Sequence, residues 1–121
     1  MPIFRRWMEG LKQVGPVSGG TGSWGPQKSV TISGGVATFT GAGRYLIDTE
    51  GAAASDDLDT INGLIDGDEV ILSPASGSRT VVLKNGTGNL DIKTDITMND
   101  ADDRVRLIKE TTNLVEASSR P

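Results

Sequence analysis

The stretch DEVILSPASGSRTVVLK, residues 68–84, contains two short apolar runs that flank the turn pair Ser76-Gly77. Both runs are rich in β-branched residues and are too short for helices, so each of them predicts a strand. Similar runs recur at intervals of roughly ten residues from position 28 onward, with turn residues between them. The expected strands are residues 29–32, 36–40, 44–49, 68–73, 79–84, 90–98, 104–110 and 113–118. This spacing predicts an all-β domain, a small sandwich or barrel of about seven to eight short strands, over residues 28–121.

Turn and cap residues predict the connections within this domain. The first two expected strands flank the glycine-rich residues 33–35 and should therefore form a hairpin. Residues 54–64 are expected to form one short helical turn, because they offer a serine cap, aspartates in the first turn and a glycine near the end. In that turn Leu58 and Ile61 would face the sheet.

Residues 1–27 have a different composition and are expected to form an extended arm that precedes the domain. Apolar residues near the N-terminus recur at helical spacing, which predicts a short amphipathic helix. The glycine-, serine- and proline-rich residues 15–27 then predict a linker, because such a segment buries too little surface to fold. Trp24 in that linker either fills a pocket on a partner or caps the nearby domain. The residues expected to dock onto a partner are Ile3, Phe4, Arg5, Arg6, Trp7, Met8, Leu11 and Trp24.

Charge and composition exclude several classes of function. The chain has 121 residues and a net charge of −4. The absence of cysteine removes disulfides, thiolate nucleophiles and cysteine-ligated metals, and the absence of histidine removes the commonest general base and metal ligand. Residues 1–47 carry five basic side chains and one acidic side chain, whereas residues 48–121 carry seven and fifteen. An acidic body does not suit nucleic acid, and no apolar run is long enough to span a membrane. We therefore expect a non-enzymatic protein made in the cytoplasm, with no cofactor and no metal.

Three acidic clusters are candidates for a catalytic or a calcium-binding site, namely residues 56–59, 66–69 and 100–103. None of them matches the calcium-binding loop pattern, so each is interpreted as a cap or a turn. A pair of carboxylates could also cleave a glycosidic bond, but that reaction needs a cleft with aromatic side chains. The expected β region offers only Phe39 and Tyr45 for such a cleft.

Three strands contain triplets that are apolar at every position, namely residues 45–47, 70–72 and 81–83. If both faces of these strands are buried, a single sandwich cannot cover them all. The simplest cover is another copy of the chain, and the alternative is the N-terminal arm. The expected residues of an oligomer interface are Tyr45, Ile47, Ile71 and Val82.

The order of motifs over residues 43–116 resembles a small β domain of tailed-bacteriophage virion proteins. The motifs are DTEG at residues 48–51, SDDLDTINGL at 55–64, DGDEVIL at 66–72, RTVVLKNGTGN at 79–89 and NLVE at 113–116. Domains of this kind occur in capsid-decoration and head-fibre proteins and at the ends of tail fibres and tail spikes.

The resemblance implies a homotrimeric structural protein of the virion, without an active site. The expected function is that of a capsid decoration or cement protein that docks on the major capsid protein, or another virion protein, through its arm. The alternatives are a tail-fibre, tail-spike or adaptor component, or a carbohydrate-binding module that recognises a receptor.

Overall fold

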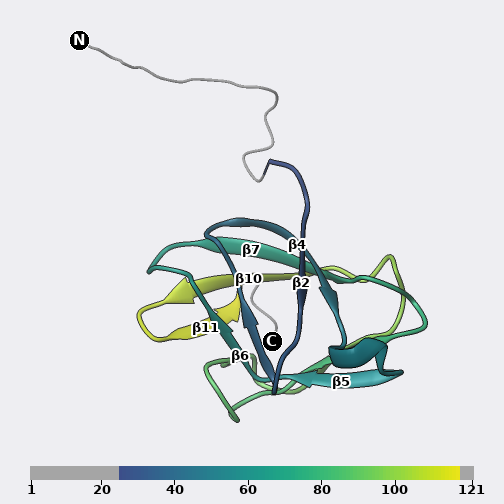
Figure 1. Ribbon diagram of the computed structural model, residues 1–121. Helices are drawn as coiled ribbons and strands as arrows, with labels where there is room; N and C mark the ends of the chain where they lie inside the picture. The colour runs from purple at the N-terminus through teal and green to yellow at the C-terminus, as the bar shows by residue number, and fades with distance from the viewer. Residues whose placement is uncertain (1–24, 118–121) are drawn as a thin grey trace.

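The computed structural model describes residues 25–117, and the regular secondary structure of this part of the chain is almost entirely β-strand (Figure 1). The one helical element among these residues is a 3-10 turn, η2 (Glu50–Ala52). The strands are β2 (Lys28–Thr31), β3 (Val36–Thr38), β4 (Gly43–Asp48), β5 (Ser55–Leu58), β6 (Thr60–Asn62), β7 (Glu69–Pro74), β8 (Thr80–Leu83), β9 (Ile96–Met98), β10 (Val105–Glu110) and β11 (Asn113–Glu116). The prediction of an all-β domain is confirmed for this region. The predicted amphipathic helix of the arm lies outside the described residues.

The strands form three sheets, and consecutive strands from β2 to β8 belong to different sheets. The largest sheet has the order β11-β10-β7-β4-β2, and the smaller sheets are β3-β6 and β5-β8-β9. The pairs β2–β4, β4–β7, β3–β6 and β5–β8 are all parallel. Each parallel pair joins one turn of the chain to the next, so the chain winds as a short coil. Paired residues are 17 positions apart in β2–β4 and 24 to 27 positions apart in the other three pairs.

This coil differs from the predicted sandwich or barrel in how the strands are connected. In a sandwich or an up-and-down barrel, successive strands reverse and pair antiparallel. Here β4, β5 and β6 follow one another around corners, and each of them pairs with a strand from another turn of the coil. Antiparallel pairing appears where the coil ends, because β9 pairs with β8, and β10 pairs with both β7 and β11.

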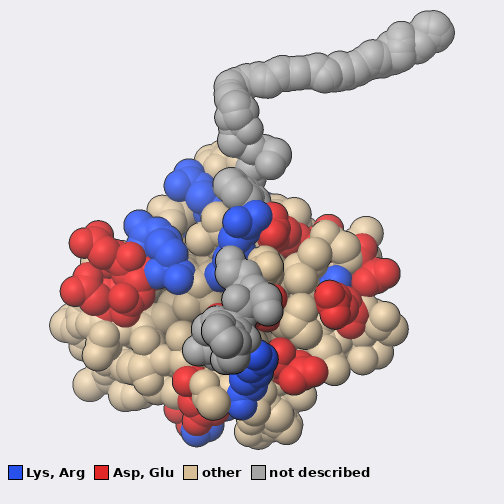
Figure 2. Space-filling view, turned by 180° about the vertical axis from the view of Figure 1, so that it is seen from behind, with Lys and Arg blue, Asp and Glu red and all other residues tan. Residues whose placement is uncertain are grey.

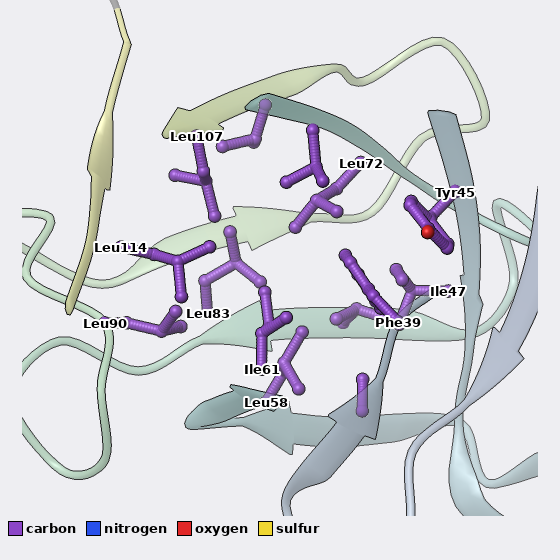
Figure 3. Close-up of a cluster of buried hydrophobic side chains, with 14 of the residues drawn as sticks. Phe39, Tyr45, Ile47, Leu58, Ile61, Leu72, Leu83, Leu90, Leu107 and Leu114 are labelled. Carbon is purple, nitrogen blue, oxygen red and sulfur yellow. The ribbon is translucent and has the colours of Figure 1, made fainter. Parts of the chain in front are cut away.

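The core forms where side chains from successive turns stack between the sheets. Figure 3 shows side chains from several strands, including Ile47, Leu72, Leu83 and Leu107, pointing toward one another. Tyr45 joins this core, its ring stacked on that of Phe39 with 3.8 Å between the ring centroids. Packing of this kind excludes water and supplies most of the stability of such a domain.

The core corrects the prediction for two residues of the oligomer interface. Tyr45 is 1% exposed and Ile47 is 0% exposed, so both pack inside the subunit rather than on its surface. The apolar triplets alternate after all: the middle residues Leu46, Ile71 and Val82 point away from the core and are half-buried. An apolar residue at every position therefore does not mean that both faces of these strands are equally covered.

The predicted helical turn at residues 54–64 is wrong, because this segment forms β5 and β6. Leu58 and Ile61 are fully buried, as expected, but they reach the core as strand residues. Leu58 pairs with Leu83, and Ile61 pairs with Ala37. These long-range partners outweigh the local cap signals, since short helices have little stability of their own.

Two other predicted elements are also shorter or differently paired. Residues 33 and 36 make one antiparallel bridge, but β2 and β3 belong to different sheets and form no extended hairpin. Within residues 90–98 the strand β9 covers only the last three positions, and Leu90 makes a single bridge to Leu114.

The side chain of Asn89 takes the place of a strand beside β6. Its Oδ1 accepts a hydrogen bond from the backbone N–H of Ile61 at 2.9 Å, and its Nδ2 donates to the backbone oxygen of Ile61 at 2.8 Å. Its own backbone oxygen accepts from the N–H of Leu114 at 2.8 Å. Asn89 thus joins the coil to the final strand where the β3–β6 sheet has no third member.

We predict that Asn89→Ala lowers the free energy of unfolding by about 2–4 kcal/mol, because it leaves the N–H and the carbonyl of Ile61 without these partners. Chemical denaturation measures the change. Asn113→Ala is the matched control, since Asn113 is exposed on β11, and it should change stability by about 0.5 kcal/mol or less. Equal effects of the two substitutions would contradict the bridging role of Asn89.

We also predict that Gly63→Ala is much more destabilising than Gly67→Ala. Both glycines have a φ of 93°, so alanine is strained at either position by roughly 1–2 kcal/mol. At Gly63 an added Cβ would overlap the backbone oxygen of Phe39, whereas nothing lies within 4 Å of one at Gly67. The overlap should add about 1–3 kcal/mol. Thermal and urea unfolding of both variants would test this, and equal losses would contradict it.

Candidate interaction surface

The side of the five-stranded sheet that faces away from the core carries an aliphatic strip. Leu46 on β4, Ile71 on β7, Ile108 on β10 and Val115 on β11 all lie on this side, as the alternation with buried neighbours shows. All four side chains are half-buried. We call this side of the sheet the outer face.

The strand register places charged residues next to this strip. Ile71 pairs with Arg44 on one side and with Arg106 on the other, which makes one row across three strands. Ile108 pairs with Glu69 and with Val115 in a neighbouring row. Apolar and charged side chains thus alternate over short distances on the outer face.

The four arginines of the described residues lie on this face or at its border, and they differ in their partners. Arg106 Nε is 3.0 Å from Glu69 Oε2, and Arg79 Nε is 2.7 Å from Asp48 Oδ1. The other two bond to backbone oxygens: Arg44 Nη2 donates to Gly25 at 3.3 Å, and Arg104 Nη1 donates to Ala101 at 2.9 Å. Figure 2 shows basic and acidic groups adjoining one another on the side of the molecule opposite to that in Figure 1.

The acidic clusters hold turns in place by bonding to the backbone. Asp56 Oδ2 accepts from the N–H of Glu50 at 2.8 Å, and Asp66 Oδ1 accepts from the N–H of Thr111 at 2.9 Å. Asp103 Oδ2 accepts from two successive backbone N–H groups, at residues 99 and 100. The interpretation as turn acids is confirmed for Asp66 and Asp103, whereas Asp56 lies on β5 and bonds to the first residue of η2. Over residues 25–117, no group of three or more acidic side chains is placed to hold a metal ion.

Two ion pairs shift the pKa values of their members. The hydrogen bond from Arg79 lowers the pKa of Asp48 below its ordinary value of 3.8, against the opposing effect of burial. The hydrogen bond between Lys84 and Asp95, 2.8 Å long, raises the pKa of Lys84 and lowers that of Asp95. Both pairs fasten strands or loops that are distant in the sequence, and neither lies in a row with Ile71.

The predicted site residues fall into three groups. The docking residues of the arm, from Ile3 to Trp24, lie outside the described residues. Tyr45 and Ile47 belong to the core, as described above, and Ile71 and Val82 point outward from two different sheets.

Three further aliphatic residues on the side of Ile71, namely Leu46, Ile108 and Val115, were not predicted as surface residues. A period-two reading of residues 43–48 and 105–110 could have found the first two, since both segments alternate in burial.

No protein-family model, no curated protein and no solved structure matches the chain. No helix in the described part of the chain is long and apolar enough to cross a membrane.

We predict that Arg79→Gln raises the pKa of Asp48 toward its ordinary value, because the guanidinium that stabilises the carboxylate is removed. Because the pKa of Asp48 is lowered in the folded state, the pair stabilises the fold at pH values above the pKa that Asp48 has in the unfolded chain. This stabilisation is lost as the pH falls through the pKa of the folded state. NMR titration of the Asp48 carboxyl would measure the change. Lys84→Gln is the control, since it should move the pKa of Asp95 and leave that of Asp48 unchanged.

Proposed function

We propose that the chain is a non-enzymatic structural protein of a tailed-bacteriophage virion. In this proposal it is made in the host cytoplasm, assembles as a homotrimer, and decorates the capsid as a cement or head-fibre-like protein. The observation that supports it is the place of the resembling motifs in the fold. DTEG ends β4 and enters η2, SDDLDTINGL forms β5 and β6, and NLVE forms β11. These motifs therefore form the strands and corners of the coil. A structural role on the surface of a virion requires a stably folded domain of this kind.

The proposed docking element is the N-terminal arm, whose apolar side chains recur at helical spacing. Burying one large apolar side chain contributes roughly 1.5–3 kcal/mol, whereas a surface ion pair contributes about 0–1 kcal/mol. Phe4 and Trp7 should therefore dominate the affinity, and Arg5 and Arg6 should set orientation and association rate. The glycine-rich linker would let a trimer reach a lattice whose local symmetry differs from its own.

One observation weighs against the alternative of a carbohydrate-binding module. Sugar recognition of this kind relies on exposed aromatic rings, and Tyr45 was one of the few candidates in the sequence. Tyr45 is buried, its ring stacks on Phe39, and its hydroxyl donates to the backbone oxygen of Gly41 at 2.7 Å. Placement in a tail fibre, a tail spike or an adaptor remains the alternative location for the same structural role.

We predict that the double variant Phe4→Ala/Trp7→Ala binds undecorated capsids about 100-fold or more weakly, because two anchors are lost. Co-sedimentation with capsids assembled without this protein would measure binding. Gln13→Ala, on the polar side of the expected helix, is the matched control and should bind as the parent chain does. Deletion of residues 1–15 should abolish binding while light scattering still reports a trimer.

Several outcomes would contradict the proposal. A deletion variant that unfolds or aggregates would show that the arm packs against the β domain of the same chain and is needed for its fold. Selective binding on a glycan array, without binding to capsids, would favour receptor recognition. A stable monomer at micromolar concentration would exclude the homotrimer.

A further inference from the structure

Three pairs of adjacent residues in this chain have the chemistry to form a cyclic imide spontaneously. In an asparagine-glycine or aspartate-glycine pair, the backbone nitrogen of the glycine can attack the side-chain carbonyl carbon of the residue before it. Glycine favours this attack because it has no side chain to obstruct it and lets the backbone rotate freely. The pairs are Asn62-Gly63, Asp66-Gly67 and Asn85-Gly86. All three lie in the described part of the chain, so their surroundings can be compared.

The pair Asn85-Gly86 is held at the atoms that this reaction uses. Asn85 Oδ1 accepts from the N–H of Ile92 at 2.9 Å, and Asn85 Nδ2 donates to the backbone oxygen of Lys93 at 3.0 Å. The N–H of Gly86 donates to the backbone oxygen of Leu90 at 2.9 Å. Ring closure requires these hydrogen bonds to break together, so the fold protects this pair.

The pair Asp66-Gly67 is held in the same way. Asp66 Oδ1 accepts from the N–H of Thr111 at 2.9 Å, and the N–H of Gly67 donates to the backbone oxygen of Lys109 at 2.8 Å. An ionised carboxylate is also a poorer target than an amide, because its negative charge makes the carbon less electrophilic. Asp66-Gly67 is therefore protected by the fold and by its own charge.

The pair Asn62-Gly63 has none of these restraints. Asn62 is the last residue of β6 and is exposed. Within residues 25–117, neither the side-chain amide of Asn62 nor the N–H of Gly63 makes a hydrogen bond. The backbone oxygen of Asn62 accepts from the N–H of Phe39 at 2.8 Å, but this oxygen takes no part in ring closure. The nucleophile and the group that it attacks are thus both available in the folded chain.

We propose that Asn62-Gly63 is a site of spontaneous deamidation in the folded chain, and that the other two pairs are protected. The nitrogen of Gly63 bonds to Cγ of Asn62 and gives up its proton, and the side-chain amide leaves as ammonia. Water then opens the imide at one of its two carbonyl carbons. Attack at Cγ gives aspartate, and attack at the backbone carbonyl gives isoaspartate, whose main chain is longer by one carbon.

Isoaspartate at this position would alter a corner with little spare room. The backbone of Gly63 passes the carbonyl of Phe39 so closely that an added Cβ would overlap it, while Asn62 accepts a hydrogen bond from the N–H of Phe39. An extra main-chain carbon changes the distance between these two contacts. Phe39 is 2% exposed and stacks on Tyr45, so the disturbance reaches the core (Figure 3). The domain should therefore lose stability as it ages.

The test follows the three pairs in the full chain by peptide mapping and mass spectrometry. The chain is incubated at mildly alkaline pH, once folded and once in urea. In the folded chain we expect Asn62 to be converted at least about 10-fold faster than Asn85, because only Asn85 must first break hydrogen bonds. In urea the two rates should agree within about 3-fold, since both asparagines precede glycine and neither is held. Equal rates in the folded chain, or conversion of Asn62 in urea only, would overturn the inference.

The variant Asn62→Gln is the matched control for the effect on stability. Glutamine keeps an exposed amide but must close a larger ring, so it reacts far more slowly. Aged parent chain should unfold at a lower urea concentration than fresh parent chain, whereas aged and fresh Asn62→Gln should unfold alike. An equal loss on ageing in both chains would contradict the role of Asn62.

The variant Asn62→Asp separates the new charge from the longer main chain. It carries the carboxylate without the extra carbon, so freshly purified Asn62→Asp should unfold at the same urea concentration as fresh parent chain. A loss as large as that of aged parent chain would assign the effect to charge and contradict the account of the corner. These measurements involve neither assembly nor a virion, so their failure leaves the proposed function unaffected.

Discussion

In-register stacking of one turn of the chain on the next is the constraint on which the other features of this structure depend. Leu58 lies beside Leu83, and Ala37 lies beside Ile61, because strands from successive turns of the coil pair in parallel within the same sheet. The corners between strands must therefore take up little space. Gly63 meets this requirement where its backbone passes the carbonyl of Phe39, at a distance that leaves no room for a side chain. The β3–β6 sheet has no third strand beside β6. There the side-chain amide of Asn89 supplies the two hydrogen bonds that a further strand would have made to Ile61.

The same constraint explains why several aspartate side chains bond to the backbone at the corners of the coil. An acidic chain that folds into tight corners has many backbone N–H groups left outside its short ladders, and aspartate side chains accept from them. Asp56, Asp66 and Asp103 all serve in this way. These three aspartates thus hold corners of the coil, whereas Arg44 and Arg106 lie on the outer face of the largest sheet.

Local patterns in the sequence predicted the strands well but not their pairing. Residues 44–49, 68–73, 79–84 and 104–110 were placed within one or two positions of β4, β7, β8 and β10, because each is a short apolar run between turn signals. The parallel register was not predictable, since residue 58 has no local sign that its neighbour is residue 83. For the same reason the cap signals at residues 54–64 suggested a helix. Of the four residues predicted at an oligomer interface, Ile71 and Val82 point outward, whereas Tyr45 and Ile47 face the core. An all-apolar triplet does not reveal which of its residues face the core.

The attachment of β2 has a mechanical consequence. This strand is at the edge of the large sheet and is the first strand after the arm, so any force applied through the arm reaches the domain at Lys28. The four residues of β2 pair in parallel with residues 45–48 of β4, and Ile32 donates to the carbonyl of Asp48 just beyond them. A pull along the strand loads these hydrogen bonds together, in shear, whereas a pull across it opens them one at a time. The direction in which a force acts on Lys28 therefore determines how much tension the domain withstands before β2 detaches.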